Sequence, residues 1–294
     1  MLKASDLSIF FKMSIVKFVV ISAIAGYGIA FTVEQSFDIF HLIRFLLGTF
    51  FISAGSLSLN QVQEVANDTQ MERTQIRPIV KGVLSRRSGF AISISFITVG
   101  LAILYGINPV TCLIGTSIIL MYNGFYTMFW KKNWAFAAVP GAVPGALPGV
   151  LGYSALNTDI FSPPPIYLFL VMFLWQMPHF WSLAIRYADD YKRGSFPVLP
   201  AVVGEGRTKY HISFYVWAYV LLGIMSPFFV DYSYAYFCLV LPFCVLMVWA
   251  YLRYWNATEQ KAWLPFFLIT NFSMLAFLFA PLIDRWIPIL FQVS

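Results

Sequence analysis

The chain carries apolar segments of about 20 residues that recur along almost its whole length, and this feature constrains its fold more than any other. Hydrophobic residues make up 60% of the 294, charged residues only 11%, and the mean hydropathy is +0.74. A soluble core of this length could not bury so much apolar surface. A helix crosses the hydrocarbon core of a bilayer with about 20 residues. The sequence therefore predicts an all-α, polytopic membrane protein.

These segments predict about nine transmembrane helices in a single integral-membrane domain, residues 1–294, around a central cavity that opens to the cytoplasmic side. The predicted spans cover residues 14–33, 40–60, 89–107, 109–130, 133–156, 164–186, 210–230, 233–253 and 263–283. Asn108 and Pro109 separate the third span from the fourth. An odd number of spans places the two termini on opposite sides. The two longest connections follow the second and sixth spans, which suggests a four-helix pseudo-repeat.

The basic residues gather on one side of the predicted bundle. A net charge of +6 could indicate nucleic-acid binding on a soluble face, but these charges lie in short segments between apolar runs, so we expect no nucleic-acid partner. Of the 19 Lys and Arg residues, 17 fall in the amino-terminal segment and alternate connections, and only Arg44 and Arg285 lie opposite. The positive-inside rule then predicts a bacterial plasma (inner) membrane protein whose amino terminus and long connections are cytoplasmic.

Three polar residues repeat at intervals of four where the first long connection begins: Asn60, Glu64 and Asp68. Four residues turn an α-helix through about 400°, so these side chains should line one face. Carboxylates near hydrocarbon cost about 2.5 to 3.5 kcal/mol each and need a positive partner. Mg²⁺ binds one or two carboxylates together with phosphate oxygens, and the guanidinium groups of Arg73 and Arg77 suit phosphate. The pattern indicates a diphosphate site; a solvated helix with ordinary salt bridges is the alternative.

The segment LNQVQEVANDTQMERTQIRPIVKG, residues 59–82, resembles the first signature of the UbiA-type intramembrane prenyltransferases. Its MERTxxRP portion is typical of the protohaem IX farnesyltransferases, or haem O synthases. The resemblance implies a catalytic Mg²⁺ site formed by Asn60, Glu64 and Asp68. It also implies that the isoprenoid diphosphate is bound by Arg73, Arg77 and Lys81. Most relatives have Asp in place of Glu64, so whether this longer side chain reaches the metal directly or through water is open.

A second segment, FLWQMPHFWSLAIRYADDYKRGSFPVLPAVVG, residues 173–204, resembles the same enzymes through WQMPH, DY and PVLP in that order. Other branches usually have a second Asp-x3-Asp motif here. This chain has Asp190 with Gly194 four residues later, which is half of that pair. The resemblance implies that Asp190 is a catalytic residue and the second metal contact. The alternative is a hydrated turn.

His179 lies inside the sixth predicted span, where an ionisable side chain is rare and by default functional. By itself, a hydrogen-bonded core histidine fits nearly as well. The acceptor of haem O synthases is an iron porphyrin, and neutral imidazole is a common haem ligand. The resemblance therefore implies that His179 binds the acceptor.

The fifth predicted span contains Pro140, Pro144 and Pro148, each followed by Gly. Such a helix should be bent or partly unwound, and it could either line the substrate cavity or pack tightly on a neighbour. Lys131, just before it, could bind diphosphate or serve only as a topology anchor. Lys12 precedes Met13 where relatives have Pro, and we assign it no role.

The reaction that the resemblance implies transfers a farnesyl group from farnesyl diphosphate to a vinyl group of haem B, with Mg²⁺ as cofactor. Expected partners are these two substrates, the lipid bilayer, and haem A synthase or terminal oxidase assembly proteins. A UbiA-type enzyme with a quinone-precursor acceptor is one alternative, and WQMPH argues against it. A secondary transporter is another, because broken helices and intramembrane charge also occur there. Acids paired with phosphate-suited arginines argue for a diphosphate enzyme instead.

Overall fold

The computed structural model describes residues 3–32, 35–230, 234–257 and 260–291, and every regular element in these ranges is a helix. Residues 33 and 233, the predicted limits of two spans, lie outside them. The helices are α1 Ala4–Phe10, α2 Met13–Ala30, α3 Ile39–Gln63, α4 Val65–Asp68, η1 Glu72–Thr74, α5 Arg86–Tyr105, α6 Pro109–Ile119, η2 Leu120–Trp130, α7 Lys131–Asn133, α8 Ala138–Ser154, α9 Pro163–Arg186, α10 Ala188–Arg193, α11 Leu199–Val203, α12 Glu205–Met225, η3 Ser226–Phe228, α13 Tyr234–Asn256, η4 Gln260–Ala262 and α14 Trp263–Phe291.

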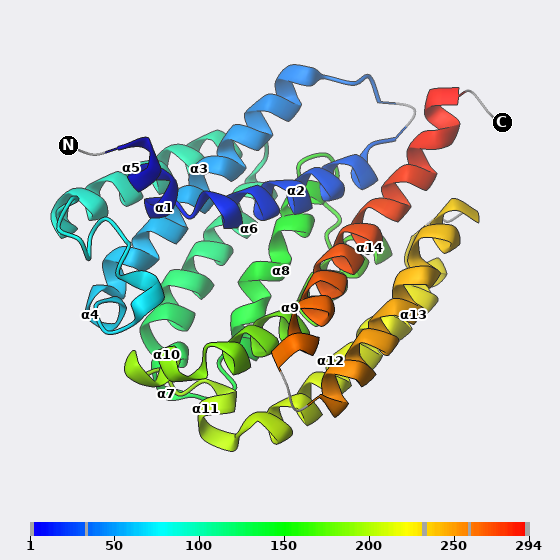
Figure 1. Ribbon diagram of the computed structural model, residues 1–294. Coiled ribbons are helices and arrows are strands. Elements are labelled where there is room, and N and C mark those ends of the chain that lie inside the picture. The colour runs from blue at the N-terminus through cyan, green and yellow to red at the C-terminus, as the bar shows by residue number, and fades with distance from the viewer. Residues whose placement is uncertain (1–2, 33–34, 231–233, 258–259, 292–294) are drawn as a thin grey trace.

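Within the described residues, eight helical segments are long and apolar enough to cross a membrane, and α8, with 17 residues, is the further predicted span. The prediction of an all-α protein with about nine spans is therefore confirmed. The short helices α4, α7, α10 and α11 gather at one end of the bundle, which we call the charged end (Figure 1). The helix α1 packs against the end of α3, because the Gln61 side chain donates to the carbonyls of Ile9 and Phe10 at 2.7 and 3.0 Å. The helix α14 ends on the side opposite the charged end (Figure 1).

Both long connections begin with the same kind of backbone break. The helix α3 ends before Glu64, which has φ −101° and ψ 11°. The helix α9 ends before Tyr187, which has φ −109° and ψ 28°. A short helix follows each break, and each short helix carries one buried aspartate, Asp68 in α4 and Asp190 in α10. This repeated geometry supports the predicted four-helix pseudo-repeat.

The third and fourth spans separate at Asn108, as predicted. The Asn108 side chain accepts a hydrogen bond from the backbone N–H of Thr111 at 2.9 Å, and Pro109 occupies the first turn of α6. The fourth span then widens into the π-helical segment η2, which the sequence did not predict. Asn123 of η2 and Gln63 of α3 exchange two hydrogen bonds, so the widened turns are tied to the end of α3.

The helix α8 does not unwind at its prolines. Pro144 and Pro148 lie inside one continuous helix, so of the two expected forms, bent or partly unwound, the unwound one is wrong. Neighbouring helices can satisfy backbone groups that a proline leaves free. Gln176 of α9 also ties α8 to its neighbour, because its side-chain N–H donates to the carbonyl oxygen of Ala142 at 3.1 Å.

Glycines bring α8 directly against α2. A Cβ atom on Gly152 would overlap the carbonyl oxygen of Ala23, and one on Gly26 would overlap that of Gly149. The tight-packing alternative therefore holds on this face of α8. The two largest hydrophobic cores both contain residues of α2 and of α8. The contact between these two helices therefore joins the two cores.

Candidate active site

Glu64 is buried at the charged end and forms an ion pair with Lys131. The Lys131 Nζ atom lies 2.7 and 2.9 Å from the two carboxylate oxygens, so it donates to both. Glu64 comes from the break after α3, and Lys131 comes from the end of the widened fourth span. Burial opposes the charge of Glu64, but Lys131 and Lys12 outweigh it and hold the pKa of this carboxyl below its ordinary value.

Asp68 is fully buried and forms an ion pair with Arg77. Burial raises the pKa of Asp68, because the loss of water outweighs the attraction of Arg77. The backbone N–H of Asp68 bonds to the Glu64 carbonyl at 2.9 Å, and that of Glu64 bonds to the Asn60 carbonyl at 3.0 Å. The helical hydrogen-bond pattern thus continues through the break, which keeps the three predicted residues on adjacent turns.

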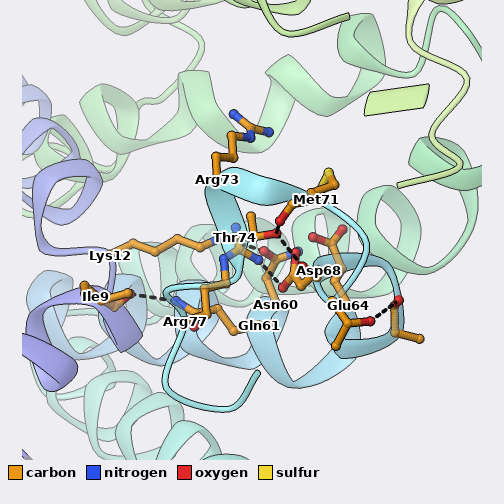
Figure 2. Close-up of polar contacts among 12 residues, drawn as sticks. Ile9, Lys12, Asn60, Gln61, Glu64, Asp68, Met71, Arg73, Thr74 and Arg77 are labelled. Carbon is orange, nitrogen blue, oxygen red and sulfur yellow. Dashed lines mark hydrogen bonds and ion pairs between the residues drawn. The ribbon is translucent and has the colours of Figure 1, made fainter. Parts of the chain in front are cut away.

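Lys12 belongs to this group, although the sequence assigned it no role. It lies between α1 and α2 with φ +50°, and its Nζ donates to the Asn60 side-chain oxygen at 2.6 Å (Figure 2). Burial and the nearby Arg77 lower its pKa to about 7. The sequence offered one weak signal, a lysine directly before an apolar span on the side where the signature residues lie. We call Lys12, Asn60, Glu64, Asp68, Arg77 and Lys131 the polar cluster.

Asp190 forms a second group beside the polar cluster. It accepts hydrogen bonds from the Glu72 backbone N–H and from Arg193, both at 2.9 Å. Arg73 approaches it at 3.6 Å and also lies over the Tyr191 ring at 4.7 Å. Arg73 thus points away from Asp68 and Arg77 (Figure 2). The two predicted diphosphate arginines therefore serve different groups, because residues 69–85 form a folded connection with only one 3-10 turn instead of one helix face.

A hydrogen bond joins the two long connections. The Asn67 side chain donates to the Gly194 carbonyl at 2.9 Å, so α4 and the residue after α10 are in direct contact. The two signature segments of the sequence therefore meet in space.

Lys81 and His179 are not joined to these groups by any hydrogen bond or ion pair among the described residues. The Lys81 side chain is exposed, and only its backbone N–H contacts the site region, through the Arg77 carbonyl. His179 lies between the rings of Trp175 and Phe267, with centroids 4.6 and 4.8 Å away. Its Nδ1 atom is buried with no hydrogen-bond partner.

The carboxylates of the polar cluster suit a hard divalent cation. One oxygen of Asp68 is buried without a hydrogen-bond partner, and so is one oxygen of Asp190. Carboxylate and amide oxygens are the donors that Mg²⁺ prefers. In the described part of the chain, no three acidic, histidine or cysteine side chains are close enough to share one metal ion. Glu64, Asp68 and Asp190 therefore do not form one three-ligand set. Asp190 pairs instead with Arg73 and Arg193.

Most of the chain matches one known protein family. Residues 19–275 match the model of the UbiA prenyltransferase family. The chain belongs to this family.

Within the UbiA family, the chain groups with the protohaem IX farnesyltransferases. It is 43% identical over 275 residues to a protein named protoheme IX farnesyltransferase from Bdellovibrio bacteriovorus, and the match covers 94% of both chains. It is 31% identical over 288 residues to a protein of the same name from Geobacillus thermodenitrificans, with 95% of this chain and 90% of that protein covered.

Solved structures share the UbiA fold at low sequence identity. A UbiA homologue from Archaeoglobus fulgidus bound to GPP and Mg²⁺ superposes with a TM-score of 0.66 at 19% identity, covering 94% of this chain and 99% of that one. A digeranylgeranylglyceryl phosphate synthase structure gives a TM-score of 0.76 at 18% identity, covering 95% and 98%. These likenesses establish the fold of the chain.

Proposed function

We propose that this chain transfers a farnesyl group from farnesyl diphosphate to a vinyl group of haem B, which gives haem O and diphosphate. The observation that carries the proposal is the 43% identity, over 94% of both chains, to a protoheme IX farnesyltransferase. Buried carboxylates and cations at the charged end, contributed by both signature segments, support it as a diphosphate site.

The chemistry requires that the C1–O bond of farnesyl diphosphate break and that its electrons leave with the diphosphate. The terminal carbon of the vinyl group then bonds to C1, water adds to the neighbouring carbon, and one proton is released. The vinyl group reacts through its own π electrons, so no strong base has to prepare it. Stabilising the leaving diphosphate is therefore the main demand on the protein.

The residues of the polar cluster meet that demand. Lys12, Arg77 and Lys131 outnumber the carboxylates Glu64 and Asp68, so the cluster favours an added anion. Mg²⁺ would be held by Glu64 and Asp68 with Asn60, and a second ion by Asp190; when bound, such an ion supplies Lewis-acid stabilisation of the leaving phosphate oxygens. Arg73, beside Asp190, would bind the diphosphate from the second group, and Lys81 would do so only after its exposed side chain turns inward.

Aromatic rings already face the cations of this region. The Phe196 ring lies 4.3 Å from the Lys131 Nζ, and Tyr191 lies next to Arg73. The electron-rich faces of such rings attract positive charge. The same faces would shield the allylic cation that forms as the diphosphate leaves.

His179 is our proposed contact to the haem acceptor. Its unpartnered Nδ1 and its place between two aromatic rings suit a porphyrin-binding imidazole. The distribution of basic residues supports an inner-membrane protein whose charged end, with the polar cluster, is cytoplasmic. Haem A synthase and terminal oxidase assembly proteins remain the proposed partners, because haem O would be handed on to them.

Pigment analysis of membranes tests the proposal. Bacterial membranes that lack a haem O synthase should accumulate haem O when this chain is expressed, and the Asp68→Asn variant, expressed to the same level, should not produce it. Asp68→Asn removes the negative charge that would bind the metal and the neighbouring cation, but it adds no bulk. The variant should therefore still insert into the membrane. Prenylated quinone precursors in place of haem O would assign the other acceptor, and equal haem O from both proteins would refute the site.

A further inference from the structure

A cleft of about 790 Å³ opens at the charged end beside the ends of α3, α5 and η2. Its apolar walls come from Leu59, Val62, Phe90 and Met128. Phe90 and Met128 are 52% and 44% exposed, so the cleft faces outward between helices that span the membrane. The cleft therefore opens toward lipid and not only toward water.

Three cations border the same cleft: Arg86, Arg87 and Lys132. No carboxylate pairs with any of them in the part of the chain that the structure describes. The Arg86 Nε atom donates to the Val62 carbonyl at 3.1 Å, which holds this side chain along the wall. The cleft thus has apolar walls and an uncompensated positive rim.

The position of the two arginines in α5 increases the demand for an anion. Arg86 and Arg87 are the first two residues of α5, and this helix has no acidic residue in its first turn. The amino terminus of a helix already carries partial positive charge. The two guanidinium groups at the start of α5 are therefore repelled by the helix terminus and by each other. An anion beside the first turn would relieve both sources of repulsion.

The cleft is separate from the polar cluster. Lys131 pairs with Glu64, whereas its neighbour Lys132 lines the cleft. Gln63 also lines the cleft, and its side chain exchanges hydrogen bonds with Asn123. A ligand in the cleft would therefore contact α3, α5 and the fourth span without touching Glu64.

We propose that this cleft binds an anionic phospholipid of the adjoining leaflet. The phosphate lies at Arg86, Arg87 and Lys132, and an acyl chain lies along the apolar walls. Basic pockets between transmembrane helices at a charged interface bind anionic head groups, and the cleft has both the charge and the apolar surface for one. Bound there, the lipid links the ends of α3 and α5 to the helix that carries Lys131.

The test compares the wild-type protein with two triple variants that lose equal charge. The cleft variant is Arg86→Gln, Arg87→Gln and Lys132→Gln. The control variant is Lys3→Gln, Lys192→Gln and Arg207→Gln, whose exposed side chains lie at the charged end outside the cleft. A third variant, Arg86→Lys, Arg87→Lys and Lys132→Arg, keeps the charge and controls for folding.

Each purified protein is equilibrated with mixed micelles of phosphatidylcholine and phosphatidylglycerol in equal parts, and native mass spectrometry counts the retained lipids. We expect the wild-type, control and charge-keeping proteins to retain phosphatidylglycerol in preference to phosphatidylcholine. In the cleft variant the affinity should fall by about fivefold for each cation removed. Undiminished retention by the cleft variant, an equal loss in the control variant, or equal retention of both lipids would overturn the proposal. Displacement of phosphatidylglycerol by haem B or farnesyl diphosphate would also overturn it, because the cleft would then be a substrate site.

Discussion

Breaking the ion pair between Glu64 and Lys131 should lower the free energy of unfolding, and the size of the loss should depend on which of the two residues is replaced. The Glu64 side chain is 1% exposed, so Lys131→Met leaves a carboxylate with almost no access to water. The Lys131 side chain is 17% exposed and flexible, so after Glu64→Gln its ammonium group can turn toward the solvent. We therefore expect Lys131→Met to be the more damaging change.

The magnitudes follow from the geometry of the pair. Removing one partner of a buried pair costs about 3 to 5 kcal/mol, and Lys131→Met should fall in this range because both Glu64 oxygens lose a donor. Glu64→Gln should cost about 1 to 2 kcal/mol, since the amide oxygen still accepts a hydrogen bond. The double variant removes both charges of this pair, so neither partner is left unpaired and the cost should be at least about 2 kcal/mol less than the sum of the single changes.

Denaturant unfolding of the purified proteins in detergent, followed by tryptophan fluorescence, provides these free energies. The pair has a pH signature as well: the pKa of Glu64 is lower in the folded protein than in the unfolded chain, where it is 4.5. Its contribution to stability is therefore complete above that value and disappears as the pH falls below it. Additive single changes, or a larger cost for Glu64→Gln than for Lys131→Met, would refute this reasoning. All three variants should also fail to make haem O.

Three further predictions concern Lys12, His179 and the topology. Lys12 has a pKa of about 7, so its charge disappears as the pH rises through 7, and the KM for farnesyl diphosphate should rise there in the wild-type protein but not in Lys12→Arg. Between pH 7 and 10.5 the folded protein binds fewer protons than the unfolded chain, so the free energy of unfolding should increase with pH. A free energy of unfolding that falls over this range would exclude the lowered pKa of Lys12. His179→Ala should lower haem O formation per folded enzyme by at least about tenfold while farnesyl diphosphate still binds, and His179→Gln should restore little; high activity of the Gln variant would reduce His179 to a packing residue. In a cysteine-free background, a cysteine at Gly82 should be labelled only from the cytoplasm and one at Thr158 only from the opposite side, and labelling of both from one side would contradict the span assignment.

Features that depend on local sequence were predictable. The apolar segments gave the spans, because crossing hydrocarbon forces a helix to satisfy its own backbone. Asn108 and Pro109 marked a helix boundary through capping chemistry that needs only neighbouring residues. The spacing of Glu64 and Asp68 predicted their proximity, and it survived the break after α3 because the hydrogen bonds between successive turns continue.

Features that depend on tertiary contacts were not predictable. Lys12 reaches Asn60, 48 residues away, only because the junction of α1 and α2 packs at the end of α3. Arg73 and Arg77 point to different groups because the connection after α4 folds back on itself. Their four-residue spacing would place them on one face only if the connection were a helix. The continuous α8 depends on its neighbours, since its proline spacing alone favours a disrupted helix.

The π-helical segment η2 fixes how many residues the fourth span can contain. A π-helix closes i→i+5 hydrogen bonds and so places more residues in each turn than an α-helix does, and deleting one residue from Leu120–Trp130 would change the width of these turns and the register of their hydrogen bonds. Lys131 is the first residue after this segment, and its Nζ would swing away from Glu64. The length of this segment, and not only its composition, is therefore a condition for an intact ion pair between Lys131 and Glu64.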